Sequence, residues 1–259
     1  MKKDTLVFIT GASSGIGAAC AEAFARHGAR LLLCARGAAR LHEQADRLRQ
    51  DHGVAVHAFA LDVRDAAQVE QALGALPEAW QAIDVLVNNA GLAKGRDKVY
   101  EHPPEHIDAM IDTNVKGLLY VTRAVVPGMV ARGRGHVVNI GSTAGHEVYP
   151  GGVVYSASKH AVDAITKGLK MDLLGTPLRV STVDPGLVET EFSLVRFSGD
   201  ATRAEAVYAG MQPLRPEDVA DAVVYCVTRP PHVNINEIVM MPVAQSSSLL
   251  VHRKKETLP

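Results

Sequence analysis

The chain has 259 residues, 47% of them hydrophobic and 21% charged, which is enough for a well-packed domain and excludes disorder over most of its length. The formal net charge is −1, so no excess of positive charge favours nucleic acid or an anionic membrane as a partner. No apolar run approaches the ~20 residues that a membrane-spanning helix needs.

The cysteines, Cys20, Cys34 and Cys226, are odd in number, and their spacing matches no metal-binding motif. We therefore expect free, buried thiols in a reducing compartment and no bound metal. The apolar run that follows the two N-terminal lysines is too short for a secretory signal, because Gly11 and the Ser-Ser-Gly after it break the run. These features predict a cytoplasmic protein.

Short apolar runs alternate with longer amphipathic stretches along the chain. The runs predict seven strands, at 5–10, 29–35, 55–63, 83–91, 135–142, 178–186 and 237–242. The stretches between them predict helices, at 15–28, 38–52, 66–76, 105–131, 155–174 and 216–228. The runs are apolar at consecutive positions, which is typical of strands that are buried on both faces.

This alternation predicts an α/β protein, a single-domain Rossmann fold whose doubly wound, parallel, seven-stranded sheet has helices on both faces. Residues 1–245 form the domain, and the polar, basic segment 246–259 is a C-terminal tail, either solvated or docked on a neighbouring subunit. Ligands bind at the carboxyl ends of such strands. The irregular segments 91–104 and 187–211 are therefore expected to hold the substrate, the second of them as a lid.

A glycine-rich turn lies between the first predicted strand and the first predicted helix. Its G-x-x-x-G-x-G spacing differs from the commoner dinucleotide fingerprint, and alone it also fits a structural turn. At this place glycine permits a tight turn, and the helix amides then face a pyrophosphate. We expect the cofactor to contact Gly11, Ser13, Ser14, Gly15, Ile16 and Gly17.

The end of the second predicted strand carries Arg36 where an acidic residue would bind the ribose 2′-hydroxyl of NAD, and Arg40 follows one helical turn later. Arginine forms charge-assisted bonds with phosphate, so we predict NADP(H), with a solvated surface pair as the alternative. Asp62, before Val63, suits either the adenine amino group or the cap of the next helix. The fourth strand ends in small and amide residues that suit a close cofactor or a simple turn, Asn89, Ala90 and Gly91.

Tyr155 and Lys159 have the i, i+4 spacing that puts both side chains on one face of a helix. An ammonium group favours the phenolate and lowers the tyrosine pKa from its usual value of about 10, which makes the tyrosine a usable acid or base. Ser142, at the end of the fifth strand, can hydrogen-bond a substrate oxygen. In a chain that also has a nucleotide-binding turn, Tyr155 and Lys159 after Ser142 predict a catalytic site rather than a chance spacing.

Taken together, the segments TGASSGIG, DV, NNAG, YSASK and DPG, with Asn114 and Ser142 between them, resemble the short-chain dehydrogenase/reductase family over nearly the whole chain. The resemblance implies a catalytic tetrad of Asn114, Ser142, Tyr155 and Lys159, in which Asn114 holds its helix and an ordered water. It also implies that Lys159 binds the nicotinamide ribose. The nicotinamide end would further contact Pro185, Gly186, Val188 and Thr190.

A narrower resemblance, in YPGG, PGLVETEFSLVRF and PPHVNIN, is to the NADP-dependent 3-hydroxy acid dehydrogenases, typically homotetramers, a dimer being the other possibility. It implies oxidation of the β-hydroxyl of a small acid such as serine, allo-threonine or 3-hydroxypropionate, or the reverse reduction. The expected substrate contacts are Ser142, His146, Tyr149, Tyr155 and Arg196. The segment before Tyr149 lacks the aromatic residue expected from this branch.

We expect Arg196, or a neighbouring lid residue, to bind the acid group of the substrate; the alternative is a surface pair with Glu189 or Glu191. A second function is reduction of a bulkier or sulfonated carbonyl compound, such as sulfoacetaldehyde or a clavulanate-pathway aldehyde. An isomerase or dehydratase on the same fold, and a catalytically silent NADP-sensing protein, are further alternatives. The presence of Tyr155 and Lys159 argues against the last.

Overall fold

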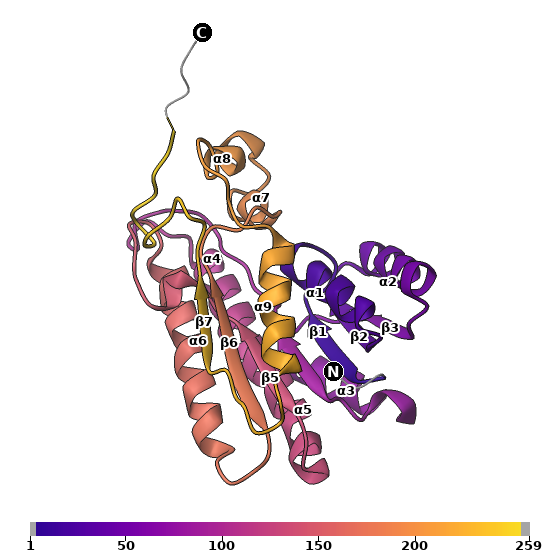
Figure 1. Ribbon diagram of the computed structural model, residues 1–259. Coiled ribbons are helices and arrows are strands. Elements are labelled where there is room, and N and C mark those ends of the chain that lie inside the picture. The colour runs from indigo at the N-terminus through magenta and orange to yellow at the C-terminus, as the bar shows by residue number, and fades with distance from the viewer. Residues whose placement is uncertain (1–3, 255–259) are drawn as a thin grey trace.

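The computed structural model describes residues 4–254 and places seven parallel strands in one sheet, in the order β3-β2-β1-β4-β5-β6-β7 (Figure 1). The predicted doubly wound sheet is therefore confirmed. The five strands from β1 to β5 are β1 (Leu6–Thr10), β2 (Arg30–Ala35), β3 (Val56–Ala60), β4 (Val85–Asn88) and β5 (His136–Ile140). The last two are β6 (Arg179–Pro185) and β7 (Glu237–Met240).

Helices cover both faces of the sheet, and each face has its own hydrophobic cluster. One cluster packs α1 (Gly15–Arg26), α2 (Ala38–His52) and α9 (Pro216–Thr228) against the sheet. The other contains side chains of α3 (Ala66–Gly74), α5 (Leu118–Arg132) and α6 (Val153–Asp172). Every residue of β1 and β5 is buried, because those strands have helices on both sides.

The stretch predicted as one helix at 105–131 is interrupted. It consists of α4 (Pro104–Ile111), a π-helical turn (Asp112–Gly117) and α5. The π turn contains Asn114, and such turns inside helices often occur at functional sites. The apolar period of this stretch predicted the helical tract but not the extra residue in its middle, because one wide turn leaves the overall pattern unchanged.

Strand β1 lies between β2 and β4, so the direction of winding reverses there and a crevice opens at the carboxyl ends of these strands. Above it lie two short helices, α7 (Phe192–Arg196) and α8 (Ala201–Ala206), which belong to the predicted lid segment (Figure 1). Two 3₁₀ turns, Glu78–Trp80 and Thr143–Gly145, complete the elements of the described residues. No helix in residues 4–254 is both long and apolar enough to cross a membrane.

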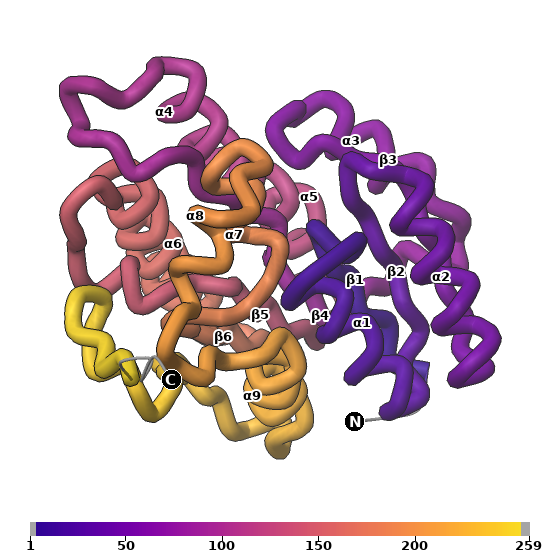
Figure 2. The backbone as a smooth tube through the Cα atoms, turned by 90° about the horizontal axis from the view of Figure 1, so that it is seen from above, coloured from indigo at the N-terminus to yellow at the C-terminus, as the bar shows by residue number. Residues whose placement is uncertain are grey.

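The segment after Gln245 was expected to be solvated or to dock on a neighbouring subunit. Its residues up to Lys254 turn back through a bridge between Gln245 and Val251 and pack on the same chain beside the lid (Figure 2), and docking on a neighbouring subunit stays a prediction. Arg253 donates hydrogen bonds to the carbonyls of Val207 and Ala209. These backbone carbonyls after α8 hold the basic segment in place. Composition does not reveal such a contact, because its partners are distant in the chain. Residues 255–259 of the predicted tail lie outside the described range.

Candidate active site

The glycine turn between β1 and α1 is packed against the end of β4. Gly11 has φ +64°, and a Cβ atom there would stand 2.9 Å from Cα of Ala90. Asn89 Nδ2 donates hydrogen bonds to the carbonyl oxygens of Thr10 and Gly11, at 2.9 and 3.0 Å. Helix α1 then begins at Gly15 without a side-chain cap, so its first amides are available to a ligand at the helix N-terminus.

A cavity of about 850 Å³ runs from this turn to the lid. It brings together most of the residues predicted for cofactor and substrate, from β1, β2, β4, β5, α6 and the lid. Four of the predicted residues do not line it, namely Gly17, Arg40, Asn114 and His146. Gly17 instead packs against the backbone of Gly11, where a Cβ atom would collide.

The two arginines predicted to bind a 2′-phosphate have different surroundings. Arg36 is exposed and lines the cavity. Arg40 forms a bidentate ion pair with Glu191 of the lid, at 2.9 and 3.0 Å. This pair joins α2 to the residue just before α7. Arg36, which directly follows β2, is therefore the one of the two arginines that lines the cavity.

Asp62 also lines the cavity, and Arg64 holds its carboxylate through bonds to both oxygens. These hydrogen bonds with Arg64 are the main cause that lowers the pKa of Asp62. The alternative that Asp62 caps the following helix is wrong, because the cap of α3 is Asp65, whose side chain accepts from the amide of Gln68 at 3.0 Å.

The residues of the predicted tetrad come from three elements. Tyr155 and Lys159 lie on α6, and Lys159 Nζ stands 5.9 Å from the centre of the Tyr155 ring and donates to the carbonyl of Ile140 at 2.8 Å. Ser142 directly follows β5, and its hydroxyl accepts from the amide of Ala144 at 3.1 Å.

Asn114 reaches this group from the π turn. Its side chain accepts from the amide of Leu92 and donates to the carbonyl of Leu92, both at 2.8 Å, and donates to Ser158 Oγ at 3.0 Å. Asn114 thus connects the segment after β4 with α6. Its predicted link to Lys159 through a water molecule stays a prediction.

The proton-handling groups have shifted pKa values. Burial raises the pKa of Tyr155, and the charge of Arg196 and hydrogen bonding with Ser142 oppose the rise. Burial lowers the pKa of Lys159 to about 8, opposed by the nearby Asp184 carboxylate. The sequence predicted that the Lys159 ammonium lowers the pKa of Tyr155. In this structure burial raises that pKa, and the positive charge that opposes the rise is that of Arg196.

The family model described as short chain dehydrogenase matches residues 5–199. The chain belongs to this family. It is 47% identical to the NADP-dependent 3-hydroxy acid dehydrogenase of Salmonella typhi, over 96% of this chain and 99% of that protein. It is 46% identical to sulfoacetaldehyde reductase 2 of Chromohalobacter salexigens, over 94% of this chain and 96% of that protein. The closed form of serine dehydrogenase complexed with NADP⁺ is similar in structure, with a TM-score of 0.91 and 47% identity, over 96% of this chain and 100% of that one.

Arg196, at the end of α7, points into the catalytic end of this short-chain dehydrogenase. Its Nη2 donates to the hydroxyl of Tyr149, and its Cζ stands 5.1 Å from the ring centre of Tyr155 and 5.6 Å from that of Phe192. Its Nε is buried and has no hydrogen-bond partner among the described residues. The alternative pairing with Glu191 is not found, because Glu191 binds Arg40.

His146 is turned away from the cavity, contrary to its predicted contact with the substrate. Its Nε2 stands 2.9 Å from Asp184 Oδ2, near the carboxyl end of β6, and 3.1 Å from Oε1 of Glu237, the first residue of β7. Two carboxylates attract the imidazole to the outer side of the turn that follows Ser142. His146 thus anchors this turn, while the neighbouring Tyr149 does line the cavity.

Some cavity residues lie in the C-terminal segment, which sequence reasoning did not assign to the site. They are Gln245, Ser248, Leu249, Val251 and Arg253. The amide of Ser248 donates to Glu147 at 2.7 Å, and the amide of Leu187 donates to the Gln245 side chain at 2.8 Å. The only available signal was the apolar Leu-Leu-Val run within an otherwise polar tail.

Proposed function

We propose that this protein is an NADP-dependent dehydrogenase that interconverts a small 3-hydroxy acid and its carbonyl form. The observation that carries the proposal is the Arg196 guanidinium, which stands 5.1 Å from the Tyr155 ring centre with a buried Nε that has no partner among the described residues. A carboxylate bound there would place a hydroxyl two carbons away near Tyr155 and Ser142. The full-length relatives with this activity support the assignment.

The residues present fit a dinucleotide. The turn at Gly11 has no room for a side chain, the cap-free start of α1 offers amides to the pyrophosphate, and Arg36 offers a charge to the 2′-phosphate. Near the catalytic end, Asn89, Lys159 and the residues after β6 would hold the nicotinamide ribose and ring. When bound, the nicotinamide supplies or accepts the hydride.

Tyr155 handles the proton. Its raised pKa keeps the phenol protonated at neutral pH, so the phenol can donate to a carbonyl oxygen as that oxygen gains charge. Ser142 lies beside it and hydrogen-bonds the same oxygen. The ammonium of Lys159 and the guanidinium of Arg196 both favour the phenolate that is left behind. Oxidation of a hydroxyl uses the same groups in reverse, with the phenolate as base.

Arg196→Ala tests the proposal. We expect KM for 3-hydroxy acids, or their semialdehydes, to rise about 10- to 100-fold, as loss of a charged hydrogen bond predicts, while KM for a neutral aldehyde changes little. Arg196→Lys, which keeps the charge but not the planar fork, should be intermediate. Arg229→Ala, at the far end of α9, is the matched control. An equal rise for acidic and neutral substrates in Arg196→Ala would contradict the proposal.

A sulfonated aldehyde is the second candidate, because an arginine fork binds a sulfonate as well as a carboxylate. The relationship to a sulfoacetaldehyde reductase supports it. The two candidates differ in shape rather than in charge, since a sulfonate is tetrahedral and larger. Comparing kcat/KM for sulfoacetaldehyde and malonic semialdehyde with NADPH decides between them, and a ratio above about tenfold either way corresponds to ~1.4 kcal/mol of preference.

We extend the proposal to a cytoplasmic homotetramer. Three free, buried cysteines suit a reducing compartment. Large apolar side chains are exposed on α5, after α6 and on β7, at Leu119, Val130, Leu174 and Val239, and they suit subunit contacts. Light scattering after size exclusion should give four times the 27.6 kDa chain mass. A monomer at micromolar concentration would contradict the assembly without touching the catalytic proposal.

A further inference from the structure

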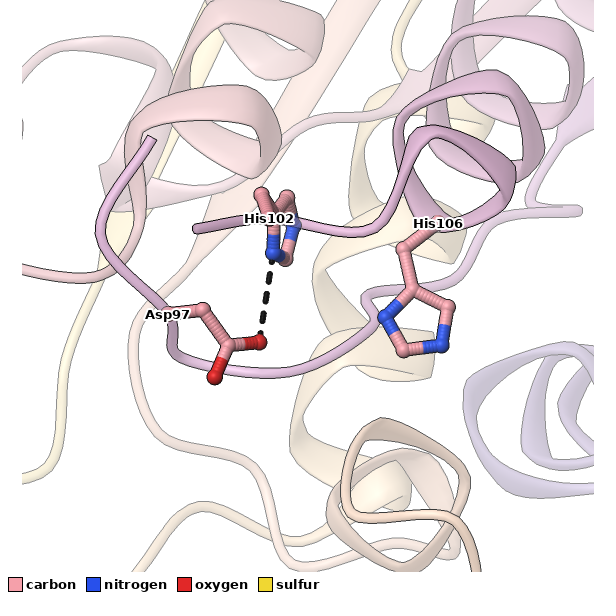
Figure 3. A group of neighbouring side chains, drawn as sticks. All are labelled: Asp97, His102 and His106. Carbon is pink, nitrogen blue, oxygen red and sulfur yellow. Dashed lines mark hydrogen bonds and ion pairs between the residues drawn. The ribbon is translucent and has the colours of Figure 1, made fainter. Parts of the chain in front are cut away.

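A group of metal-ligating side chains lies outside the catalytic cavity, in the segment between β4 and α4. Asp97, His102 and His106 each offer one ligand atom, and these three atoms all lie within 4.8 Å of one another (Figure 3). His102 Nδ1 stands 3.2 Å from Asp97 Oδ2, and the two imidazole rings stand 5.8 Å apart. None of the three residues lines the catalytic cavity, so the dehydrogenase reaction does not account for the group.

His106 provides an independent observation. Its Nδ1 is buried and has no hydrogen-bond partner among the described residues, and Figure 3 shows this edge of the ring turned toward Asp97 and His102. A buried polar nitrogen without a partner destabilises the folded protein. A ligand that accepts the nitrogen lone pair would remove this cost. The side chain of His102 is also buried, with 5% exposed, whereas Asp97 is 47% exposed and keeps the group open to solvent.

The backbone holds the three side chains in place. Gly95 has φ +63°, and a Cβ atom there would collide with the Asp97 carboxylate and stand 3.2 Å from His102 Cε1, so the segment closes tightly on itself. Pro103 and Pro104 separate the two histidines, and α4 begins at Pro104. Their fixed φ angles place His102 just before the helix and His106 in its first turn.

The geometry points to a Zn²⁺ site made by Asp97, His102 and His106, with the remaining coordination position open to solvent. Two imidazoles and one carboxylate are the donor set that zinc takes, whereas Mg²⁺ and Ca²⁺ require oxygen ligands. Zinc bonds of about 2.0–2.1 Å place neighbouring ligand atoms about 3.3 Å apart, so atoms that lie within 4.8 Å of one another need to approach by at most about 1.5 Å. The cysteine spacing could not indicate this site, because it contains no cysteine.

The proposed ion would act on the lid. The amide of Gly95 donates to the carbonyl of Arg196 at 2.9 Å, and Lys94 Nζ donates to the carbonyl of Val195 at 3.3 Å. The segment that carries the zinc ligands is therefore hydrogen-bonded to the end of α7. Holding this segment would steady the residue that we assign to the substrate acid group. The binding of the ion itself does not depend on the proposed function.

The test is zinc binding by the full-length protein, purified without a tag, stripped with chelator and saturated with NADP⁺. Competition with a chromophoric zinc chelator should give one zinc ion per chain, with a Kd in the micromolar range or below. His106→Ala should raise this Kd at least about tenfold, because it removes one of three protein ligands. Its melting temperature without zinc should stay close to that of the unmodified protein, because removal of the buried, unpartnered Nδ1 offsets the loss of the ring contact with His102.

Two variants serve as matched controls. His42→Ala removes an exposed histidine on α2, and His146→Ala removes the histidine of the other histidine–carboxylate group. Both should leave the zinc Kd unchanged. Absence of binding up to about 1 mM zinc, equal affinity in His106→Ala, or loss of binding only in His146→Ala would each overturn the proposal.

Limited proteolysis gives a second readout of the same site. Trypsin cleaves after Lys94, Arg96 and Lys98, all within the segment that carries the ligands. Zinc should slow cleavage there in the unmodified protein but not in His106→Ala, because a bound ion holds the segment closed. Equal protection by zinc in both proteins would contradict the assignment.

Discussion

Around the glycine turn, polar groups of β1 and of the residues after β4 are hydrogen-bonded to one another, whereas at the lid a buried arginine nitrogen has no partner among the described residues. Thr10 Oγ1 accepts from the amides of both Asn89 and Ala90, at 3.0 Å, and Asn89 ties the turn from the other side. Arg196 is held by one tyrosine hydroxyl and by ring contacts. These hydrogen bonds fix the shape of the first region and leave only the amides at the start of α1 for a ligand, whereas the second region keeps an unpaired side-chain donor.

This difference indicates that one end of the cavity binds the cofactor and the other end selects the substrate. A hydrogen-bonded turn presents a fixed shape to an invariant cofactor, and a lid that carries an unsatisfied cation can select an anionic substrate. Residues in the first region should therefore affect binding of the cofactor, while residues near the lid should affect substrate choice. The catalytic pair on α6 lies between the two regions, and changes there should have the largest effect.

Tyr155→Phe should reduce kcat by about 10²- to 10⁴-fold, because it removes the group that transfers the proton. Binding of NADPH, measured by fluorescence titration, should be nearly unchanged, since the ring remains in place. Substantial turnover in Tyr155→Phe would refute the role of Tyr155 in proton transfer and the placement of the catalytic pair between the two regions.

Arg36→Ala should weaken NADPH binding by about tenfold and NADH binding much less, because only NADPH carries the 2′-phosphate. The measurement is the ratio of the two dissociation constants. Arg47→Ala, an exposed arginine on α2 outside the cavity, is the matched control. A similar loss for both cofactors would mean that Arg36 supports the fold of this region rather than the phosphate.

Asp184→Asn should change the pH profile of reduction. Burial lowers the pKa of Lys159 to about 8, and the Asp184 carboxylate opposes this by favouring the ammonium. Reduction should therefore be sustained below pH 8 and fall above it as Lys159 loses its charge. Removing the carboxylate lowers the lysine pKa further, so the fall should move to lower pH. Asp172→Asn, an exposed aspartate at the end of α6, should leave the profile unchanged, and an unmoved profile in Asp184→Asn would contradict the coupling.

Features that depend on neighbouring residues in the chain were predictable, and features that depend on distant partners were not. The glycine turn, the start of α9 at Pro216 and the Tyr155–Lys159 spacing are local, so periodicity and glycine placement revealed them. Which carboxylate pairs with which arginine is decided by packing. Glu191 binds Arg40, 151 positions away, and this pairing leaves Arg196 to the cavity.

Distant partners also determine where His146 and the C-terminal segment lie. His146 follows Ser142 by four positions, yet its direction is determined by Asp184 and Glu237 on other strands. The C-terminal segment was read as a tail because its composition is polar, but Arg253 finds backbone carbonyls after α8. In both cases the decisive partner lies more than 30 positions away along the chain, at separations of 38 and 44 for Asp184 and Ala209.

The smallest expected effect concerns the Arg40–Glu191 pair, where the two regions meet. Both side chains are about half exposed, so the pair contributes at most ~1 kcal/mol, and a phosphate can displace the carboxylate. Glu191→Gln should then tighten NADPH binding by up to about fivefold by freeing Arg40, while Arg40→Ala weakens it by a similar factor and NADH changes little. Dissociation constants for both cofactors measure this. If both variants instead weaken the binding of NADPH and NADH equally, the role of Arg40 is to hold the lid closed through Glu191 and not to bind the phosphate. Arg40 would then belong to the lid region rather than to the cofactor region.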